Sequence, residues 1–590
     1  MKTMNHIYNK VKAIRSQLCI KHYALCIVAA SLFTSCMDLD PKDQLSDSQV
    51  WSKADNFQLY ANQFYGWTRD FYSKTDYQNG LSDGQHSDLR SDLVCSGTAN
   101  VYSDGTNTVP AKDGDFTTLY KRIYYCNLLL QNAEGRVDVN TPKGEALFFR
   151  AYLYFELLQK YGDAQIITEP LDIENGQLYG SRSNRLDVAK QIIADLEAAQ
   201  ELLPEQPTED GRVCKYTCMA MISRVALYEG TWQKFHVGNG SNTEESHNLL
   251  GKAYSSVRDW IKMSKNPYEL FYNATLDKDS YRYMFILEDE ECNPAGLVKS
   301  SNKEYILAHR HRLGDKTGLN ITHGWLGYSF LTSKIADMYL CQNGLPIIYN
   351  NQTNAQFQGY NTETTEFQNR DNRMDCCFLK NGEEFWDNDG KWRYGDGASA
   401  TGKTATSHSN SGYLNHKWGS ERKVPDYYES YDYPVIRYAE VLLNFAEALY
   451  EYKDGISDAD LNISINKVRQ RSNPNMTPLT NNLVTSNGLS MRDEIRRERT
   501  VELFLEGFRI DDLKRWKTAE TEMPKDLLGV VYDGTTLQTT WPDPKRSRDA
   551  ATGRILLYNG RTWAQKNYLY PLPSDQRQLN PNLSQNPGWE

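Results

Sequence analysis

The stretch GEALFFRAYLYFELLQKYG, residues 144–162, decides the fold class of this 590-residue chain. Its apolar side chains recur at intervals of three and four residues, which places them on one face of an α-helix. They are Leu147, Phe148, Ala151, Tyr152, Phe155 and Leu158. The pattern predicts a long amphipathic helix whose apolar face is buried.

Two further segments repeat this spacing. LDVAKQIIADLEAAQELLP (186–204) ends at a proline, which terminates a helix. RYAEVLLNFAEALYEY (437–452) carries the same apolar face. Long helices joined by loops are typical of stacked helix pairs, so we predict a mostly α fold.

The middle of the chain has a different character. Residues 236–430 are rich in Gly, Asn, Asp and Tyr, and no period is sustained there. We expect long loops and short elements laid over the helical platform. Residues 51–590 are then a single domain, with a helical N-terminal half (51–235) and a loop-rich and C-terminal half (236–590).

The first 35 residues are typical of a leader. They contain five basic residues, no acidic residue, and the apolar run YALCIVAASLF (23–33), which is too short to span a bilayer. The sequence FTSC (33–36) is similar to a bacterial lipobox, although Phe33 stands where Leu is usual. We predict that residues 1–35 are a removed lipoprotein signal peptide, that Cys36 carries the lipid, and that residues 36–50 form a polar tether. The alternative is that Cys36 is an inert buried thiol.

Composition excludes one class of partner. The chain is 39% hydrophobic and 24% charged, which is ordinary for a folded protein. Its formal net charge is −10, and it becomes −15 once the five basic residues of the leader are removed. A nucleic-acid partner is therefore not expected, because such binding needs a basic surface.

The cysteines that follow the leader show no clear framework. They are Cys95, Cys126, Cys214, Cys218, Cys292, Cys341, Cys376 and Cys377. We interpret most of them as buried free thiols. Cys214 and Cys218 have the spacing of half a metal site, but no second pair or His lies nearby, so a buried helix face is favoured. No metal or cofactor is expected from them.

The segment RDEIRRERTVELFLEGFRIDDLKRW (492–516) is unusually charged for an apolar-patterned helix. Three glutamates recur at i, i+4, where like charges repel. We expect structural ion pairs among Arg437, Glu498, Arg499, Glu502, Glu506 and Arg509. The alternative is a carboxylate pair for acid/base catalysis, but arginines this close would keep both carboxylates ionised.

Six segments together resemble, in order, the motifs of the SusD/RagB family. They are CMDLDPKDQLSDSQVW (36–51), GEALFFRAYLYFELLQKYGDAQII (144–167), RDNRMDCCFLKNG (370–382), YPVIRYAEVLLNFAEALYE (433–451), ERTVELFLEGFRIDDLKRW (498–516) and NYLYPLPSDQRQLNPNLSQNPGW (567–589). One departure is Asn372, where the family more often has Pro.

The resemblance implies a fold and a role. The fold would be SusD-like and mostly α, with tetratricopeptide-like helix pairs overlaid by long loops and short strands. The role would be that of a non-catalytic lipoprotein, exposed on the outer membrane and held there by its N-terminal lipid. It would bind nutrient glycan and pass it to a SusC-like TonB-dependent transporter. Asp38 and Asp40, just after the cysteine, resemble the family's surface-export signal.

Two loops are candidates for the glycan site. Sugars present hydroxyl groups and apolar C–H faces, so their sites combine aromatic rings with polar side chains. DGQHSDLRSDLV (83–94) offers Asp88, Arg90 and Asp92, in a part of the chain where the family often places polar contacts. HRHRLGDKTGLNITHGWLGYSF (309–330) offers His311, Trp325 and Tyr328.

The sequence also allows other kinds of site and function. Asp387 and Asp389 in FWDNDGKWRYGDG (385–397) hint at calcium, but no Glu follows at the EF-hand distance, so a turn is favoured. A surface glycoside hydrolase would need two carboxylates across a cleft, which sequence does not exclude. A peptide ligand and a protein-binding helical scaffold are the remaining alternatives.

Overall fold

In the computed structural model, the described residues are 51–71, 88–96, 100–314, 317–324, 329–380, 383–387, 390–393, 409–420, 425 and 427–590, with only the backbone described at 323–324, 384–387 and 390–393. The chain divides into two units, Met1–Leu59 and Tyr60–Glu590, and the architecture below is that of the second. None of the helices within the described ranges has the length and apolar character needed to cross a membrane.

Helices dominate the described residues, and the strands are short. The helices are α3 (Ala54–Asn62), α4 (Gly114–Asn132), α5 (Asn140–Tyr161), α6 (Arg185–Leu202), α7 (Lys215–Trp232), α8 (Glu244–Ile261), α9 (Ser280–Met284), α10 (Ile321–Gly324), α11 (Ser333–Met338), α12 (Asn372–Cys377), α14 (Tyr438–Lys453), α15 (Asp458–Ile463), α16 (Ile465–Ser472), α17 (Asn481–Ser486), α18 (Met491–Glu502), α19 (Arg509–Arg515), α20 (Ala519–Glu522), α21 (Leu537–Thr540) and α22 (Ser574–Leu579). The strands are β1 (Val94–Cys95), β2 (Tyr305–His309), β3 (Phe330–Leu331), β4 (Ile348–Tyr349), β5 (Gln352–Thr353), β6 (Phe378–Leu379), β7 (Glu384–Asp387), β8 (Gly390–Arg393), β9 (Leu414–Asn415), β10 (Tyr433–Arg437), β11 (Leu527–Val531) and β12 (Arg554–Tyr558).

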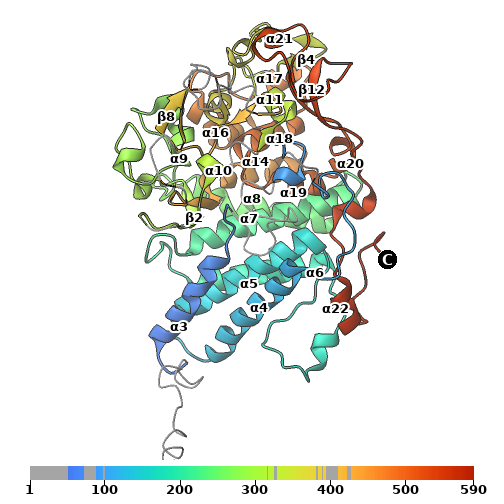
Figure 1. Cartoon of the computed structure of the whole chain (residues 1–590). Coiled ribbons are helices and arrows are strands. Elements are labelled where there is room, and N and C mark those ends of the chain that lie inside the picture. The colour runs from blue at the N-terminus through green and yellow to red at the C-terminus, as the bar shows by residue number, and fades with distance from the viewer. Residues whose placement is uncertain are drawn as a thin grey trace, which may run out of the picture. The chain divides into compact units, whose positions relative to one another are not determined.

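A stack of long helices forms the framework of the second unit. Helix α4 packs on α5, α5 on α6, α6 on α7, α7 on α8, and α8 on α14, so the layers follow one another from cyan through green to orange in Figure 1. The three helices predicted from apolar periodicity are α5, α6 and α14, and their existence is confirmed. The predicted mostly α class with helices packed in pairs is therefore correct.

Helix α5 is buried more completely than predicted. The apolar spacing indicated one buried face, but every residue from Gly144 to Tyr161 is buried. Helices α4 and α6 pack against α5, and its buried charged residues form ion pairs. Arg150, for example, donates to both carboxylate oxygens of Asp195 on α6, at 2.7 and 2.6 Å. Periodicity reports only the apolar face and does not reveal polar groups buried as pairs.

Helix α8 corrects the prediction that residues 236–430 lack long elements. It spans 18 residues, and Thr243 caps it by accepting the amide of Ser246 at 3.1 Å. Its buried residues Leu249, Leu250, Ala253, Val257, Trp260 and Ile261 do follow helical spacing. The apolar spacing of this helix was present in the sequence, but the Ser, Gly and Asn residues between the apolar positions made it hard to recognise. The rest of the described part of this region consists of short helices and strands, as expected.

Strand pairing joins segments that are distant in sequence. The order β1-β3-β9-β6 makes a small antiparallel sheet from strands of two residues each. Strand β2 pairs with β10, with Tyr433 opposite His309, and β10 leads directly into α14. This pairing fixes the end of β2 beside the helical stack.

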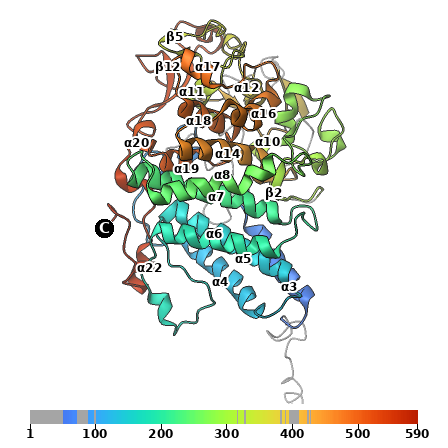
Figure 2. The same cartoon turned by 180° about the vertical axis from the view of Figure 1, so that it is seen from behind.

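The C-terminal segment returns to the helical stack, where α22 lies near α6 in both views (Figures 1 and 2). The side-chain amide of Asn580 donates to the carbonyl oxygens of Leu178 and Gly180, at 3.2 and 3.0 Å. That of Asn586 donates to the carbonyl of Tyr161 at 3.0 Å. The segment 567–589 is therefore hydrogen-bonded to the end of α5 and to the loop that follows it.

The three glutamates of the charged segment do not share one helix. Helix α18 ends at Glu502, and the chain then turns through Leu505, whose φ is +59°, before α19 begins at Arg509. Glu506 therefore lies in the turn, not one helical turn beyond Glu502. Sequence did not reveal this break, because the apolar residues between the two glutamates continue the helical spacing.

The three glutamates belong to a buried group that we call the arginine–glutamate lattice. Its members are the acids Glu304, Asp371, Glu498, Glu502 and Glu506 and the bases Arg373, Lys417, Arg437, Arg469 and Arg471, all of them buried. Five negative and five positive charges balance in this group. Arg437 contacts Glu304, Glu502 and Glu506, each at 2.7 Å. Breaking one pair would leave an uncompensated buried charge.

Arg499 and Arg509 lie outside this lattice. Arg499 pairs with Asp512 at 2.9 Å and donates to Asn444 at 2.7 Å. Arg509 makes two hydrogen bonds to the carboxylate of Asp92, at 2.8 and 2.7 Å. Both arginines therefore tie the C-terminal helices to other segments and do not neutralise the glutamates beside them.

The described cysteines form no disulfide. All eight, from Cys95 to Cys377, are buried and free. Cys214 precedes the first residue of α7 and Cys218 lies inside that helix. The prediction of buried free thiols is confirmed, and Cys218 is a buried residue of α7 whereas Cys214 is the residue that caps it.

Candidate functional site

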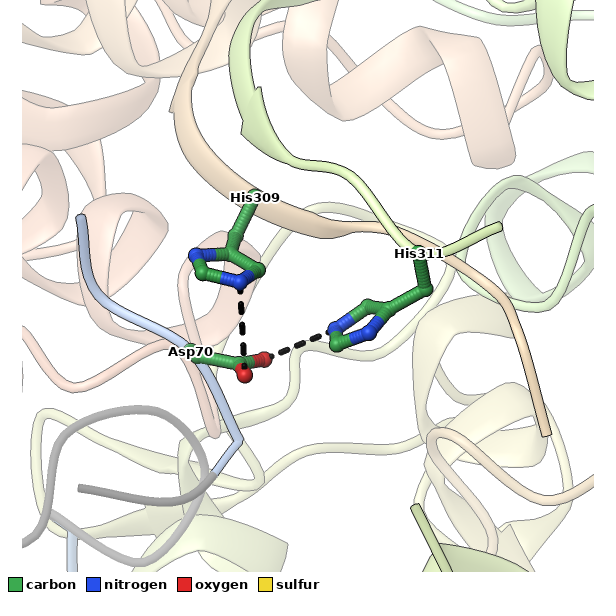
Figure 3. Close-up of side chains that lie close together, drawn as sticks. All are labelled: Asp70, His309 and His311. Atoms are coloured by element: carbon green, nitrogen blue, oxygen red, sulfur yellow. Dashed lines mark hydrogen bonds and ion pairs between the residues drawn. The ribbon is translucent and has the colours of Figure 1, made fainter. Parts of the chain in front are cut away.

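Two histidines and one aspartate meet at the end of β2. His309 is the last residue of the strand, and His311 follows two residues later on the same side. Both imidazole rings point at the carboxylate of Asp70 (Figure 3). His311 Nε2 lies 3.0 Å from Asp70 Oδ1, and His309 Nε2 lies 3.6 Å from Asp70 Oδ2.

A threonine hydroxyl contacts the His309 ring on the side away from Asp70. Thr68 Oγ1 donates to the carbonyl of Tyr65 at 3.0 Å. His309 Nδ1 lies 2.9 Å from the same hydroxyl oxygen, and this contact orients the His309 ring.

Asp70 is held ionised. Burial alone would raise its pKa, but the His311 hydrogen bond, the His309 and His311 imidazoles and the amide of Phe71 hold the pKa of this carboxyl below its ordinary value. The Phe71 amide donates to Asp70 Oδ1 at 2.7 Å. The cluster therefore presents an anionic carboxylate between two imidazoles.

A groove of about 410 Å³ lies against the same strand end. Its lining is Asn62, Tyr65, Gly66, Glu209, Asp210, Gly211, Arg212, Ala308, His309 and Arg310. The guanidinium of Arg212 lies 5.3 Å from the centre of the Tyr65 ring and pairs with Glu145 at 2.7 Å. Arg310 pairs with Asp432 at 2.9 Å. The groove thus offers one aromatic ring among many hydrogen-bonding groups, which suits a polyhydroxylated ligand.

Two exposed tyrosines lie on the neighbouring loop. Tyr427 and Tyr428 are 48% and 38% exposed, and Tyr427 has a φ of +71°, a conformation rare for an aromatic residue. The backbone of this loop is fixed, because Thr317 and Gly318 donate to the Tyr427 carbonyl at 3.2 and 3.0 Å. Strained backbone of this kind gathers at ligand sites. The exposed tyrosine side chains are therefore carried by backbone that is hydrogen-bonded at Tyr427.

Hydrogen bonds connect this tyrosine loop to the groove. The amide of His311 donates to Asp432 Oδ1 at 3.0 Å, and Lys299 pairs with the same oxygen at 2.7 Å. The segments 309–314, 317–318 and 427–432 are therefore joined by hydrogen bonds, with the groove wall on one and the exposed tyrosines on another.

The structure places the predicted ligand residues in different environments. His311 lies in the cluster with Asp70. Asp88 is completely buried and Arg90 is 3% exposed, and Arg90 donates to the Tyr570 hydroxyl at 2.9 Å. Burial raises the pKa of Asp88 to about 7, although the Leu505 amide and nearby cations oppose the shift. Neither residue is presented to a ligand at the surface. The prediction that Asp88 and Arg90 contact the glycan is therefore corrected, because both are polar groups of the interior.

The other predicted positions are not described. Trp325 and Tyr328 lie outside the described residues, between α10 and β3. Of the calcium candidates, Asp389 lies outside them too, and only the backbone of Asp387 is described, in β7. Trp325 and Tyr328 therefore stay predictions from sequence, as does the interpretation of the two aspartates.

Sequence reasoning missed Asp70, His309, Tyr427 and Tyr428. The pattern His-x-His at the end of a strand places both rings on one face, so His309 had a usable signal. Asp70 had none, because 239 residues separate it from His309 and only the fold brings them together. The two tyrosines are adjacent in PDYYESYD, where nothing distinguishes exposed from buried rings.

Comparisons with known proteins agree with this architecture. The family described as "SusD family" matches residues 302–589, and a second, described as "Starch-binding associating with outer membrane", matches residues 39–227. The chain belongs to the SusD/RagB family. The first match lies in the C-terminal half, and the second spans most of the helical N-terminal half.

Named relatives support the assignment. The chain is 25% identical to SusD-like protein P2 of Formosa agariphila over 486 residues, 80% of this chain and 79% of that one. It is 30% identical to SusD-like protein P25 of the same organism over 152 residues, only 28% of that protein's length. A crystal structure of a SusD-like carbohydrate binding protein from Bacteroides fragilis matches 91% of this chain and 100% of its own, with a TM-score of 0.70 and 23% identity. This structural likeness shows that the fold is SusD-like.

Proposed function

We propose that this chain binds nutrient glycan at the cell surface and delivers it to a SusC-like TonB-dependent transporter. Membership of the SusD/RagB family supports the role, as does the description of the similar Bacteroides fragilis protein as carbohydrate binding. The observation that carries the proposal is the surface that joins exposed Tyr427 and Tyr428 to a polar groove.

The chemistry of this surface suits a sugar. A tyrosine ring buries the apolar C–H face of a pyranose while the hydroxyl groups of the sugar stay solvated or hydrogen-bonded. Arg212, Arg310 and Asp210 line the groove and supply donors and an acceptor for those hydroxyl groups. Trp325 and Tyr328, in the segment that follows α10, are proposed as further stacking residues.

The proposed role is binding and not hydrolysis. A glycosidase needs a protonated carboxyl that faces a second carboxylate across an open cleft. Burial raises the pKa of Glu366 and of Glu429 to about 7, yet both are buried. Glu366 accepts from the Tyr413 hydroxyl at 2.7 Å, and Glu429 accepts the amides of Ile321 and Thr322. Neither has the exposure that a catalytic acid requires.

We also propose that the lipid on Cys36 holds the protein on the outer membrane, with residues 36–50 as the tether. The matching family description, "associating with outer membrane", supports this location. A membrane anchor would keep the binding surface close to a transporter in the same membrane.

Removing the exposed tyrosines tests the binding surface. The double variant Tyr427→Ala, Tyr428→Ala should lose about 1 to 3 kcal/mol of glycan affinity, the scale of lost aromatic contacts, and keep its melting temperature. Trp325→Ala should do the same if that ring stacks on the sugar. Calorimetric titration measures the affinity and a melting curve checks the fold.

The matched control is Tyr179→Ala, which removes a ring that is 47% exposed on another part of the chain. It should bind as wild type does. Equal affinity for all the variants would place the site elsewhere. If Trp325→Ala binds normally but melts much lower, Trp325 caps the core and is not a ligand contact.

The delivery role has its own test. Purifying the lipidated chain from a mild detergent extract should bring down a TonB-dependent transporter in stoichiometric amount, identified by mass spectrometry. Incubating the purified chain with the bound polysaccharide should release no new reducing ends. Recovery of the chain without a transporter would contradict the delivery role. New reducing ends would show that the protein is a hydrolase.

A further inference from the structure

We propose that Asp70, His309 and His311 bind one divalent transition-metal ion, with Zn²⁺ as the best fit. One ligand atom from each residue lies within 4.8 Å of the others, so a single ion can contact all three. Two ligands about 2.1 Å from one tetrahedral zinc ion lie about 3.4 Å apart. His311 Nε2 lies 3.0 Å from Asp70 Oδ1 and His309 Nε2 lies 3.6 Å from Asp70 Oδ2, so each imidazole is close to that separation from one of the two carboxylate oxygens. The inference does not depend on the glycan role.

The contact between His309 and Asp70 leaves room for a cation. At 3.6 Å, His309 Nε2 and Asp70 Oδ2 lie too far apart for a hydrogen bond. A metal ion would be coordinated by the imidazole of His309 and by the carboxylate of Asp70, and His311 would supply the third ligand.

Surrounding groups fix each ligand in place. Thr68 orients the His309 ring, which is the usual arrangement around a metal-binding imidazole. The amide of His311 is tied to Asp432 at 3.0 Å, and the Phe71 amide holds Asp70 Oδ1 at 2.7 Å. The ligands are therefore ordered before any ion binds, which lowers the entropic cost of binding.

Nearby arginines do not oppose a cation strongly. The three closest in sequence or along the groove are each paired with an acid: Arg69 with Glu156 at 3.0 Å, Arg212 with Glu145 at 2.7 Å and Arg310 with Asp432 at 2.9 Å. The charges of Arg69 and Arg212 are thus compensated locally, whereas Arg310 shares Asp432 with Lys299. The carboxylate of Asp70 remains to balance part of the charge of the ion.

The donor set selects the kind of metal. Two imidazole nitrogens and one carboxylate oxygen suit zinc and similar ions, whereas calcium and magnesium prefer sites made of oxygen. Three protein ligands leave a coordination position open, and His309 also lines the groove. Water or a ligand hydroxyl would fill that position. Bound metal would link the chain at residue 70 to the end of β2.

Zinc titration tests the site directly. The full chain is purified without a histidine tag, stripped with EDTA, dialysed and titrated with ZnCl₂ alone in a calorimeter. We expect one ion per chain, and an affinity at least about 100-fold weaker in His309→Ala and in His311→Ala. The control His247→Ala removes an exposed histidine that stacks on Tyr452 and should leave binding unchanged. CaCl₂ should give no comparable heat.

A second measurement on the wild-type chain keeps the proposal open to refutation even if a variant misfolds. X-ray absorption of the zinc-loaded protein should show a nitrogen and oxygen shell with the outer scattering of two imidazoles. A sulfur shell would assign the zinc to cysteines. No binding by the wild type, or equal binding by all folded variants, would reduce the cluster to a hydrogen-bonded ion pair.

Discussion

Glu502→Gln is expected to lower the free energy of unfolding by about 3 to 5 kcal/mol, the usual cost of breaking a buried ion pair. Glu502 is completely buried and contacts Arg373 at 2.8 Å, Arg437 at 2.7 Å and Arg471. Glutamine fills the same volume but removes one of the balancing charges, so the arginine–glutamate lattice is left with a net positive charge in the interior. Denaturant unfolding at pH 7 measures the effect.

The control is Glu201→Gln on the exposed side of α6, which should change stability by less than about 0.5 kcal/mol. Burial alone would raise the pKa of Glu502, but Arg471, Arg437 and Arg373 hold it well below its ordinary value of 4.5. The wild-type advantage is therefore full above pH 4.5 and declines as pH falls toward the folded-state pKa. Unchanged stability with lost glycan binding would instead make Glu502 a functional carboxylate.

Cys36→Ala is expected to abolish membrane attachment. Without the thiol no lipid can be added, so the chain is either released in soluble form or kept with its leader uncut. Fractionation of cells, followed by immunoblotting of the soluble and outer-membrane fractions, measures the result. The melting temperature of released protein should match that of the wild-type body, because the lipid contributes no packing to the core.

Cys26→Ala is the matched control, since it changes a cysteine inside the apolar run of the leader but not the proposed lipidation site. It should fractionate with the outer membrane. If Cys36→Ala still sediments with the outer membrane in high salt, the protein is held there by something other than the lipid, and the lipobox interpretation is wrong.

Sequence predicted most of the framework, because the long helices bury apolar faces with a regular period. It predicted less where polar groups are buried as pairs. The presence of Arg437 beside the glutamates was foreseeable from their repulsion, but Glu304, Arg373 and Arg471 come from separate segments and meet only in the fold. The break after Glu502 was hidden because apolar residues continue across it.

The candidate site was harder to predict for the same reason. His311 was identified, and His309 was identifiable from strand alternation, but the partner of both is Asp70 on a distant segment. Asp88 and Arg90 have side chains typical of a sugar site, yet the fold turns them inward. Residue type alone does not report which way a loop faces.

We propose that this SusD/RagB family member binds glycan through the surface that carries Tyr427 and Tyr428. The most direct measurement is the migration of the purified protein in native gels that each contain one polysaccharide, beside a gel that contains none. We expect marked retardation in at least one polysaccharide gel, and near-normal migration of the Tyr427→Ala, Tyr428→Ala variant in that gel. Wild-type migration that is unchanged by every polysaccharide would contradict glycan binding, and equal retardation of the variant would contradict this surface.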